Sequence, residues 1–351
     1  MTHAWTMKEY TPGDEHGILL LRNKVFGQAD PIRARLSTWR WQFEANPAGP
    51  FACRLAQDTD GRIVGQYAVI PTRMVVDGRE QILAFSCDTM VDPDFQRQGM
   101  FVALAKAVYK HLETARGIYA TWGFPNKNSM PGFVTRLSWK RVACFPTWAA
   151  LPLPLASWLP CLARGLAVSR PKPLPLRDPC PGVRLVPLGR FLPEHDSLWA
   201  ANAPQNTVCQ VRDSRYLNWR YFGEPGFGYQ AFSVSTDKGV EGYLVLRSLR
   251  LFHLRVLVLA DMFPLPLVSP RATARILAHI RRAGSQTGHA GIVSVFPFKH
   301  FDLARKSGLF KVPQRLSPKT WDLGFRASGP LADVLGSPNH WHILLGDTDI
   351  V

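Results

Sequence analysis

Two periodicities of hydrophobic residues alternate along the chain. Residues 61–76 and 82–91 are rich in β-branched and aromatic residues and are bounded by turn-forming residues, which predicts strands. Residues 101–116 instead repeat their apolar side chains with the spacing of a helix that buries one face, at Phe101, Leu104, Ala105, Val108 and Leu112. Strands that alternate with helices predict an α/β (α+β) fold built on mixed sheets.

The order of these elements occurs twice. In each half, a helix with an aromatic-Arg-aromatic motif precedes a Pro-Gly turn and a glycine-flanked pair of strands, in residues 37–74 and again in 215–251. A helix, an apolar strand and a Phe-Pro follow in both halves. We interpret this order as a tandem arrangement of two related domains, residues 1–145 and 183–351. The alternative is convergence between two unrelated α/β units.

Residues 146–182 differ from both halves, because they are rich in Pro and Leu and carry no charge before Arg164. Their apolar part, residues 147–169, is about as long as a membrane-spanning helix needs. However, Pro152, Pro154 and Pro160 would break or kink such a helix. We expect a packed interdomain linker. An element lying on a membrane surface is the second interpretation, and a transmembrane span is the third.

The charge balance restricts the class of partner. The 351 residues carry 42 Lys and Arg against 26 Asp and Glu, a net charge of +16. Such a balance favours acidic ligands: nucleic acid, an anionic membrane or a polyanionic cofactor. The tightest basic clusters are the pairs Arg33/Arg35, Lys140/Arg141 and Arg281/Arg282. Because no basic run contains interleaved aromatic residues, the sequence argues against nucleic acid.

Cysteine usage is typical of a reducing compartment. The six cysteines form no Cys-x-x-Cys pair and no Cys/His cluster with zinc spacing, and no His-Glu-x-x-His motif occurs. We therefore expect a cytoplasmic protein without a metal. The first 17 residues contain no apolar signal core.

A short polar loop, residues 92–99, separates a predicted buried strand from the helix at 101–116. The first turn of a helix has backbone N–H groups without partners, and together with the helix dipole they favour an anion. Gly99 lets a ligand approach the backbone, and Arg97 supplies a positive charge. The loop is therefore a candidate pyrophosphate site. The alternative is a plain strand-turn-helix link with a solvated arginine.

This loop resembles the acyl-coenzyme A signature of the GNAT N-acetyltransferase superfamily, Gln/Arg-x-x-Gly-x-Gly/Ala, which follows a strand and opens a helix. The matching residues are Gln96, Arg97, Gln98, Gly99 and Met100, and Phe101 replaces the last small residue. A second family motif consists of Asn, a small residue, an aromatic residue and then Gly-Phe. Asn126, Ser129 and Phe133 follow its spacing, with Ser138-Trp139 one residue late in place of Gly-Phe. The resemblance covers residues 5–145 directly and 183–325 only through the internal repeat.

The resemblance implies a fold, a co-substrate and a reaction. Each domain would be a mixed, mostly antiparallel sheet flanked by helices. The loop amides would hold the pyrophosphate of acetyl-coenzyme A or another short acyl-coenzyme A. Amides near Met90 and Val91, on a strand that splays from its neighbour, would bond the pantetheine arm and polarise the thioester carbonyl. An amine would then attack directly, without a covalent enzyme intermediate.

The attacking amine must lose a proton and the leaving thiolate must gain one. The family's acid is often a Tyr at the position of Phe133, which cannot donate a proton. Tyr119 is the nearest substitute, and its alternative role is a core aromatic. Ser129 is a candidate that would act through water, or else a helix cap.

Asp88 lies within a predicted strand in a hydrophobic run, where a carboxylate is costly unless paired. It is a candidate base with a raised pKa, or else a structural salt bridge or cap. Regular alternation puts Asp88 on one face of the strand and Cys87 and Thr89 on the other, and the second face is the expected substrate face. We interpret Cys87 as a buried structural thiol rather than a nucleophile.

The second half departs from the signature. Leu265, Pro266 and Pro270 stand where the loop amides are expected, and prolines have no N–H to donate. We predict that the second domain does not bind coenzyme A. Two Trp-Arg patches, residues 39–41 and 219–221, are candidates for an acceptor site, or else pack as amphipathic helices.

The sequence thus predicts an acyl-coenzyme A-dependent N-acyltransferase, most simply an N-acetyltransferase, that acts on a primary amine of a small molecule or glycan precursor. The first alternative is a catalytically weak acyl-coenzyme A-binding or scaffold protein, which the Phe133 substitution favours. The second is a peripheral membrane enzyme that acts on lipid-linked or exported glycans and touches the membrane through residues 147–169.

Overall fold

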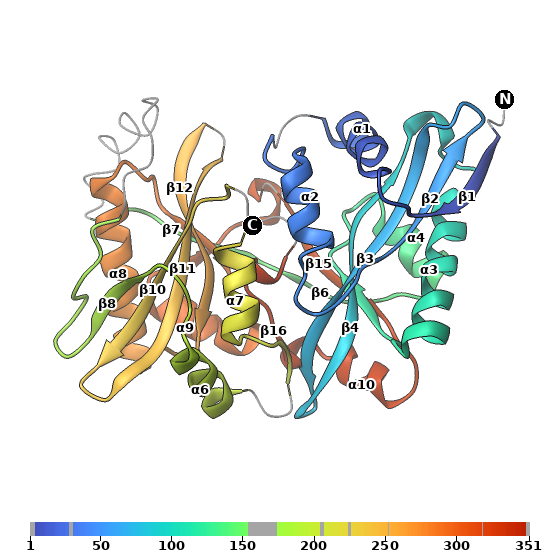
Figure 1. The fold of residues 1–351 in the computed structure, drawn as a ribbon. Helices are drawn as coiled ribbons and strands as arrows, with labels where there is room; N and C mark the ends of the chain where they lie inside the picture. Colours follow the sequence, from blue (N-terminus) through green and yellow to red (C-terminus); the bar gives the residue numbers. More distant parts are fainter. Residues whose placement is uncertain are drawn as a thin grey trace. The chain divides into compact units, whose positions relative to one another are not determined.

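A computed structural model describes residues 4–27, 31–153, 174–203, 207–223, 226–251, 253–317 and 319–348. The chain divides into two compact units (Figure 1). The first unit contains Met1–Ala143, Gly223–Gly226 and Asp322–Ser337. The second unit contains Cys144–Phe222, Phe227–Trp321 and Pro338–Val351.

The first unit is built on one mixed sheet with the strand order β1-β2-β3-β4-β5-β15-β6. Its neighbouring strands pair antiparallel from β1 to β4 and between β15 and β5, whereas β4 and β5 are parallel. Its elements are β1 (Trp5–Glu9), α1 (Glu15–Phe26), α2 (Leu36–Phe43), β2 (Ala52–Asp58), β3 (Ile63–Val76), β4 (Arg79–Val91), η1 (Pro93–Phe95), α3 (Met100–Arg116), β5 (Thr121–Gly123), α4 (Met130–Leu137), β6 (Lys140–Phe145), β15 (Trp321–Arg326) and α10 (Pro330–Gly336).

The second unit has a sheet in the order β14-β7-β13-β12-β11-β10-β8, in which β12 and β13 are the parallel pair. A short parallel pair, β9 with β16, lies apart from it. Its elements are β7 (Thr147–Ala150), β8 (Arg184–Leu188), α6 (Pro193–Asn202), β9 (Val208–Gln210), α7 (Ser214–Tyr221), β10 (Tyr229–Thr236), β11 (Gly239–Leu251), β12 (Leu254–Phe263), α8 (Pro270–Gln286), β13 (Ile292–Val295), η3 (Phe298–His300), α9 (Phe301–Lys306), β14 (Phe310–Lys311), η4 (Gln314–Leu316), η5 (Pro338–His340), β16 (Trp341–His342) and η6 (Leu345–Asp347).

The two sheets have the same strand order, and each contains one strand from the other half of the sequence. Strand β7 directly follows β6 in the chain but lies between β13 and β14, and β15 lies between β5 and β6. The predicted fold class, two mixed and mostly antiparallel sheets flanked by helices, is therefore confirmed. The exchange was not predicted: Asp322–Ser337 belongs to the first unit, and β7 is sheet rather than linker.

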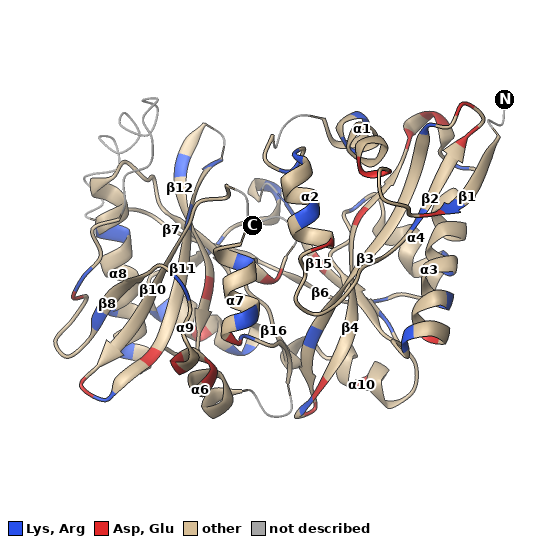
Figure 2. Ribbon diagram, in the orientation of Figure 1, with Lys and Arg blue, Asp and Glu red and all other residues tan. Residues whose placement is uncertain are grey.

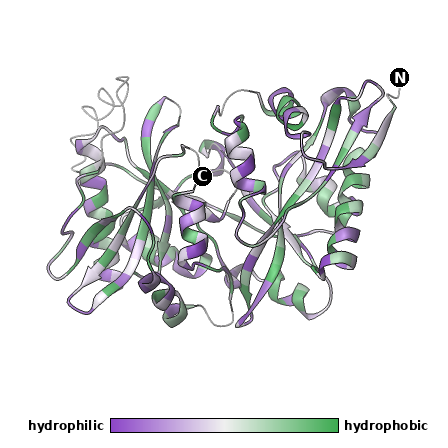
Figure 3. Cartoon of the chain, in the orientation of Figure 1, coloured by the Kyte–Doolittle hydropathy of each residue, from purple (hydrophilic) through white to green (hydrophobic). Residues whose placement is uncertain are grey.

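Helices α3 and α4 cover one face of the first sheet. Apolar residues of both helices share a core with β2 and β3 that includes Leu104, Val108, Phe133 and Val64. Helix α1 contacts β3 and β4 on the opposite face of the sheet. Gly17 of α1 lies against Ile63. Neighbouring residues of a strand point to opposite faces, so Ile63 lies on the face opposite to that of Val64. Figure 3 shows the hydrophobic residues along the strands of both sheets.

The Pro/Leu-rich segment is only partly described. Thr147–Ala150 forms β7, while residues 154–173 lie outside the described residues, so the membrane interpretation of 147–169 stays a prediction. No helix in the described ranges combines the length and the apolar character that crossing a membrane requires.

Because β15 completes the first sheet, a C-terminal substitution is expected to loosen an N-terminal strand. Leu323 is fully buried in β15. Leu323→Ala should cost roughly 2–5 kcal/mol and lower the amide-exchange protection of β5 and β4. Leu316→Ala, at a side chain that is 61% exposed, is the control and should change neither. Hydrogen exchange with peptide resolution measures both. Loss of protection confined to β10–β12 would contradict the prediction.

Candidate functional site

Strand β4 carries a bulge at Asp88. Cys87 pairs with Ala68 and Met90 pairs with Gln66, so Asp88 and Thr89 together face Tyr67. Asp88 has a φ of +45°, a left-handed backbone that is costly for a residue with a side chain. The Gln66 side-chain amide donates a hydrogen bond of 2.8 Å to the Asp88 carbonyl oxygen. A strained, locally fixed backbone therefore lies in the middle of the sheet.

The bulge reverses the alternation of side chains along β4. Ser86 is hydrogen-bonded to the Tyr67 hydroxyl, and Val91 packs against the core under α3, although the two residues are five positions apart. In a regular strand they would lie on opposite faces. The expectation that unbroken alternation places Cys87 and Thr89 together on the substrate face is therefore wrong, because the bulge adds one residue to β4 between them.

Strands β4 and β5 separate after two residue pairs. Ala84 pairs with Thr121 and Phe85 with Trp122, and β5 ends at Gly123. At Gly123 a side chain would lie 3.0 Å from the Ser86 carbonyl oxygen, so the strands are still close there. Beyond Ser86, β4 continues to Val91 with β3 as its paired neighbour. Among the described residues no strand pairs with the other edge of this part of β4, which is the kind of edge along which an extended ligand pairs.

The direction of the amides on this edge follows from one contact. The Asp92 N–H donates to the Val64 carbonyl oxygen of β3 at 2.9 Å. Because N–H groups alternate along a strand, the Val91 amide points away from β3 and toward the opening, whereas the Met90 amide points at β3. Of the two amides expected to hold the pantetheine arm, the structure directs one into the opening.

The loop after β4 has the geometry of an anion-binding turn. Arg97 and Gly99 both have left-handed backbones, with φ of +63° and +75°. Gly99 is the N-cap of α3 and no side chain caps the first turn of that helix. Successive amides in such a turn converge on one point, and the helix dipole adds partial positive charge there. Lys24 pairs with Asp92 at 2.7 Å and with Asp94 at 2.6 Å, which neutralises the carboxylates near the loop.

The corresponding helix of the second unit begins differently. Ser269 caps α8 with its own hydroxyl, which accepts the Ala272 N–H at 3.1 Å, and Pro270 at the first helical position has no N–H. The Thr273 N–H donates to the Ser269 carbonyl oxygen. Pro270 has no N–H and the Ala272 N–H is already bonded, so this turn has fewer amides for a phosphate than the uncapped first turn of α3; that the second unit binds no coenzyme A stays a prediction.

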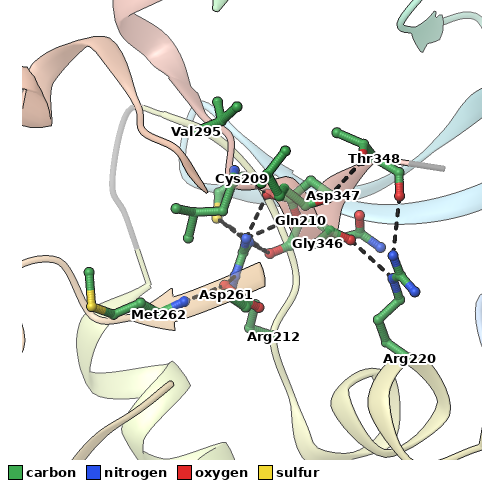
Figure 4. A network of polar contacts seen from close by, with 12 residues as sticks. Cys209, Gln210, Arg212, Arg220, Asp261, Met262, Val295, Gly346, Asp347 and Thr348 are labelled. Carbon is green, nitrogen blue, oxygen red and sulfur yellow. Dashed lines mark hydrogen bonds and ion pairs between the residues drawn. The ribbon is translucent and has the colours of Figure 1, made fainter. Parts of the chain in front are cut away.

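The opening between the parallel strands of the second unit is occupied by the chain itself. Strand β12 pairs with β13 at two positions, and η6 near the C-terminus then packs against β12. A side chain at Gly346 would lie 3.0 Å from the Ala260 carbonyl oxygen. Figure 4 shows the polar network that holds this segment. Arg220 donates to the carbonyl oxygens of Gly346 and Thr348 at 3.0 and 3.2 Å.

Arg212 is the centre of this network (Figure 4). Its guanidinium is fully buried and pairs with Asp261 at 3.2 Å and Asp347 at 2.7 Å. Asp261, at the bulge of β12, also accepts the hydroxyls of Tyr221 and Tyr243 at 3.0 and 3.2 Å. Burial raises the pKa of Asp347, and Arg212 acts against that shift. In the second unit, this network and the C-terminal segment thus lie along β12, where the first unit has the open edge of β4.

The second family motif forms the start of α4 rather than a row of donors. The Asn126 Oδ1 accepts the N–H groups of Asn128 and Ser129 at 2.9 Å, and the Ser129 hydroxyl donates to the Asn126 carbonyl oxygen at 3.3 Å. Phe133 is buried between Phe101, at 5.0 Å between ring centroids, and Trp139, at 4.5 Å. These residues fix the position of α4 over the sheet.

Tyr119 does not lie at the opening. It is 60% exposed and precedes β5 by two residues. The pairing of Thr121 with Ala84 puts it level with Ile82, roughly 13 Å along β4 from Ser86, where the opening begins. Asp88, by contrast, is at the bulge itself. Thr89, which we did not single out as a site residue, has a buried hydroxyl with no hydrogen-bond partner in the structure.

Part of each Trp-Arg patch is buried by packing, and a role at an acceptor site stays a prediction. Trp39 is buried in an aromatic cluster with Tyr10, Phe43 and Phe51. Arg220 is buried and bonded to the C-terminal segment. Lys and Arg residues are spread over helices and strands of both units rather than gathered on one element (Figure 2). Within the described ranges, no group of three His, Cys, Asp or Glu residues could hold a metal ion.

Comparison with known proteins agrees with this geometry. Residues 6–142 match the family model of the acetyltransferase (GNAT) domain. No curated protein matches the chain. Among solved structures, a GCN5-related N-acetyltransferase from Anabaena variabilis has a TM-score of 0.60 at 11% identity, over 92% of this chain and 72% of that one.

Two further structures show the same fold. A probable N-acyltransferase of unknown function from Enterococcus faecalis has a TM-score of 0.63 at 12% identity, over 92% of this chain and 73% of its own. The N-myristoyltransferase of Saccharomyces cerevisiae with bound myristoyl-coenzyme A has a TM-score of 0.60 at 10% identity, over 93% and 83%. The chain thus has the fold of these acyltransferases. The family match covers residues 6–142 in the first unit, and for the rest of the chain the likeness is one of fold.

The unpaired hydroxyl of Thr89 predicts an unusual gain in stability. Thr89→Val removes a buried hydroxyl that has no hydrogen-bond partner. The free energy of unfolding should therefore rise by about 1 kcal/mol, and the melting temperature should rise with it. Thr72→Val is the matched control, because the Thr72 hydroxyl donates to Leu83 and accepts the Trp122 indole N–H. That variant should lose about 1–3 kcal/mol. A loss at Thr89 as large as at Thr72 would show that Thr89 is bonded in solution.

The Arg212 network predicts a large effect in the second unit. Arg212→Met leaves two buried carboxylates without their cation and should destabilise that unit by about 3–5 kcal/mol. Arg305→Met removes an exposed pair with Asp302 and should cost less than about 1 kcal/mol. Chemical denaturation of both variants tests this, and equal midpoints would contradict it.

Proposed function

We propose that the protein transfers an acetyl group from acetyl-coenzyme A to a primary amine, by direct attack, at a site in the first unit. The observation that carries this proposal is the pairing of two features in that unit: an open β4 edge and, directly after it, an uncapped α3 N-terminus. In the second unit both features are closed, by Ser269 and by the C-terminal segment. A ligand with an extended amide arm and a pyrophosphate fits the first arrangement.

The residues have separate roles in this proposal. The amides of Gln98, Gly99, Met100 and Phe101 and the Arg97 guanidinium hold the pyrophosphate. The Val91 amide bonds the pantetheine arm along β4. The arm runs back toward the point where β4 and β5 meet, so the thioester lies near the bulge at Asp88 and Ser86. Holding the thioester beside the amine supplies a large part of the acceleration.

The acceptor belongs to the same proposal. The net charge of +16 favours an amine that also carries an anionic group, such as a nucleotide-sugar or another phosphorylated glycan precursor. A cytoplasmic location, which we expect from the scattered cysteines, is part of the proposal too. The alternative function, acyl-coenzyme A binding without turnover, is favoured by one observation: Phe133 is a buried core residue without a hydroxyl.

Titration calorimetry with acetyl-coenzyme A tests the site. The protein should bind one equivalent, and Gly99→Asp should weaken binding at least about 100-fold, because a carboxylate would face the pyrophosphate. Gly117→Asp is the matched control: Gly117 ends the same helix with a φ of +63°, and a side chain there also meets nothing within 4 Å. Both variants place a carboxylate on a residue with a left-handed backbone at one end of α3. They differ in whether that carboxylate faces the anion site.

Three results would count against the proposal. Equal loss of binding in both glycine variants would reflect strain in α3 rather than a site. Binding of two equivalents would show that the second unit also holds the ligand. No binding to the unmodified protein would leave only a likeness of fold. Release of free thiol in the presence of an amine library then separates an enzyme from a binding protein.

A further inference from the structure

A chain of hydroxyl groups crosses the core of the first unit. The Ser86 hydroxyl donates to the Tyr67 hydroxyl at 3.2 Å, and the Tyr67 and Tyr109 hydroxyls share a hydrogen bond of 2.7 Å in which either can donate. The Trp139 indole N–H donates to the Tyr109 hydroxyl at 2.9 Å. Four residues from β3, β4, α3 and the end of α4 thus form one continuous polar line in an apolar core.

One end of this line lies at the opening between β4 and β5. Ser86 is the residue after the last β4–β5 pair and precedes the bulge by two positions. Its side chain is on the α3 face, where Phe133 also lies. Phe133 has no hydroxyl, and its ring centroid is 6.3 Å from that of Tyr67. The hydroxyl-bearing ring that lies against Phe133 is therefore that of Tyr67, on β3.

The other end reaches a polar cavity. Tyr109 lines a cavity of about 190 Å³ together with Lys106, Lys110, Glu113 and Arg326. Arg326 lies over the Tyr109 ring at 4.6 Å and pairs with Glu113 at 2.7 Å. The line of hydroxyls thus ends at a residue that lines this cavity. The titratable and charged groups that face the line are Cys87 beside Tyr67 and Arg326 beside Tyr109.

Burial raises the pKa of Tyr67 well above its usual value and that of Tyr109 to about 12. Neither phenol therefore ionises in the working range. A row of neutral hydroxyls can still pass a proton, because each accepts one on one side while it releases one on the other. The Trp139 N–H can only donate, so it occupies an acceptor site of Tyr109 and leaves the Tyr109 proton for Tyr67 or the cavity.

We propose that Ser86 protonates the departing sulfur of coenzyme A, and that Tyr67 and Tyr109 replace its proton from water in the cavity. This inference rests on the proposed function. As the carbon–sulfur bond breaks, the sulfur keeps the electron pair and takes the Ser86 proton. Tyr67 then gives its proton to Ser86, Tyr109 to Tyr67, and water to Tyr109. The amine nitrogen releases one proton to solvent, so protons balance over the reaction.

The direction of the observed hydrogen bond fits the end of that sequence. After transfer, each oxygen holds the proton that came from its outer neighbour, so Ser86 donates to Tyr67, as it does in the structure. Rotation of the three hydroxyls restores the starting direction. In this scheme Ser86 is the catalytic residue, while Tyr67 and Tyr109 act through it and are positioning residues.

The experiment uses free coenzyme A as the probe, so it needs no knowledge of the acceptor. The pKa of the bound thiol is measured from the ultraviolet absorbance of its thiolate as the pH is raised. A donor at Ser86 stabilises the thiolate, so Ser86→Ala should raise this pKa by about one unit. Tyr67→Phe and Tyr109→Phe keep the Ser86 hydroxyl but remove a hydroxyl from the line behind it. They should raise the pKa of the bound thiol by a smaller amount than Ser86→Ala does.

Tyr10→Phe is the matched control, because it removes a phenol hydroxyl from the same unit outside the line and should leave the thiol pKa unchanged. Where Tyr67→Phe does not fold, Ser86→Ala alone decides, since Ser86 is only partly buried. Bound coenzyme A with the same thiol pKa in Ser86→Ala and the unmodified protein would overturn the relay and leave the proposed site intact. No binding of coenzyme A to any variant would instead overturn the proposed function, and the relay with it.

Discussion

The structure depends on how a pair of parallel strands ends. Every backbone N–H and C=O that leaves a sheet needs another partner, or it is buried at a cost. Strands β4 and β5 of the first unit part after two residue pairs, and so do β12 and β13 of the second. The two units satisfy this requirement in different ways. The first leaves the edge of β4 to an extended ligand, and the second covers β12 with its own C-terminal segment.

The bulge on the central strand is part of the same constraint. At Asp88 the first unit has one extra residue, and the neighbouring Thr89 hydroxyl has no partner. At the same register the second unit has Asp261, which is bonded to Arg212, Tyr221 and Tyr243. Unpaired polar groups are costly and are retained where a ligand uses them. The polar groups at the second bulge are instead satisfied within the chain.

Local pattern predicted the parts of the fold that are local. The apolar spacing of residues 101–116 corresponds to α3, Met100–Arg116, and the two strand predictions correspond to β3 and β4. The glycine of the loop takes the left-handed backbone that its position requires. The bulge at Asp88, the exchange of β7 and β15, and the place of Tyr119 were missed. Each depends on which strands pair and in which register, and periodicity within one strand does not contain that information.

Two departures from the family motifs are coupled in space. Phe101 replaces a small residue of the signature, and Phe133 stands at the position of the usual acid, yet the two rings pack together at 5.0 Å. A side chain at Gly132 would already lie 3.3 Å from the Phe101 ring. The large ring on α3 therefore requires a ring without a buried polar tip on α4, because a hydroxyl there would lose its water. Tyr67 and Tyr109 carry their hydroxyls a few ångströms away, where each has partners. The hydroxyls that the proposed relay uses therefore come from β3, β4 and α3 and not from α4, where the packing of Phe133 on Phe101 is apolar.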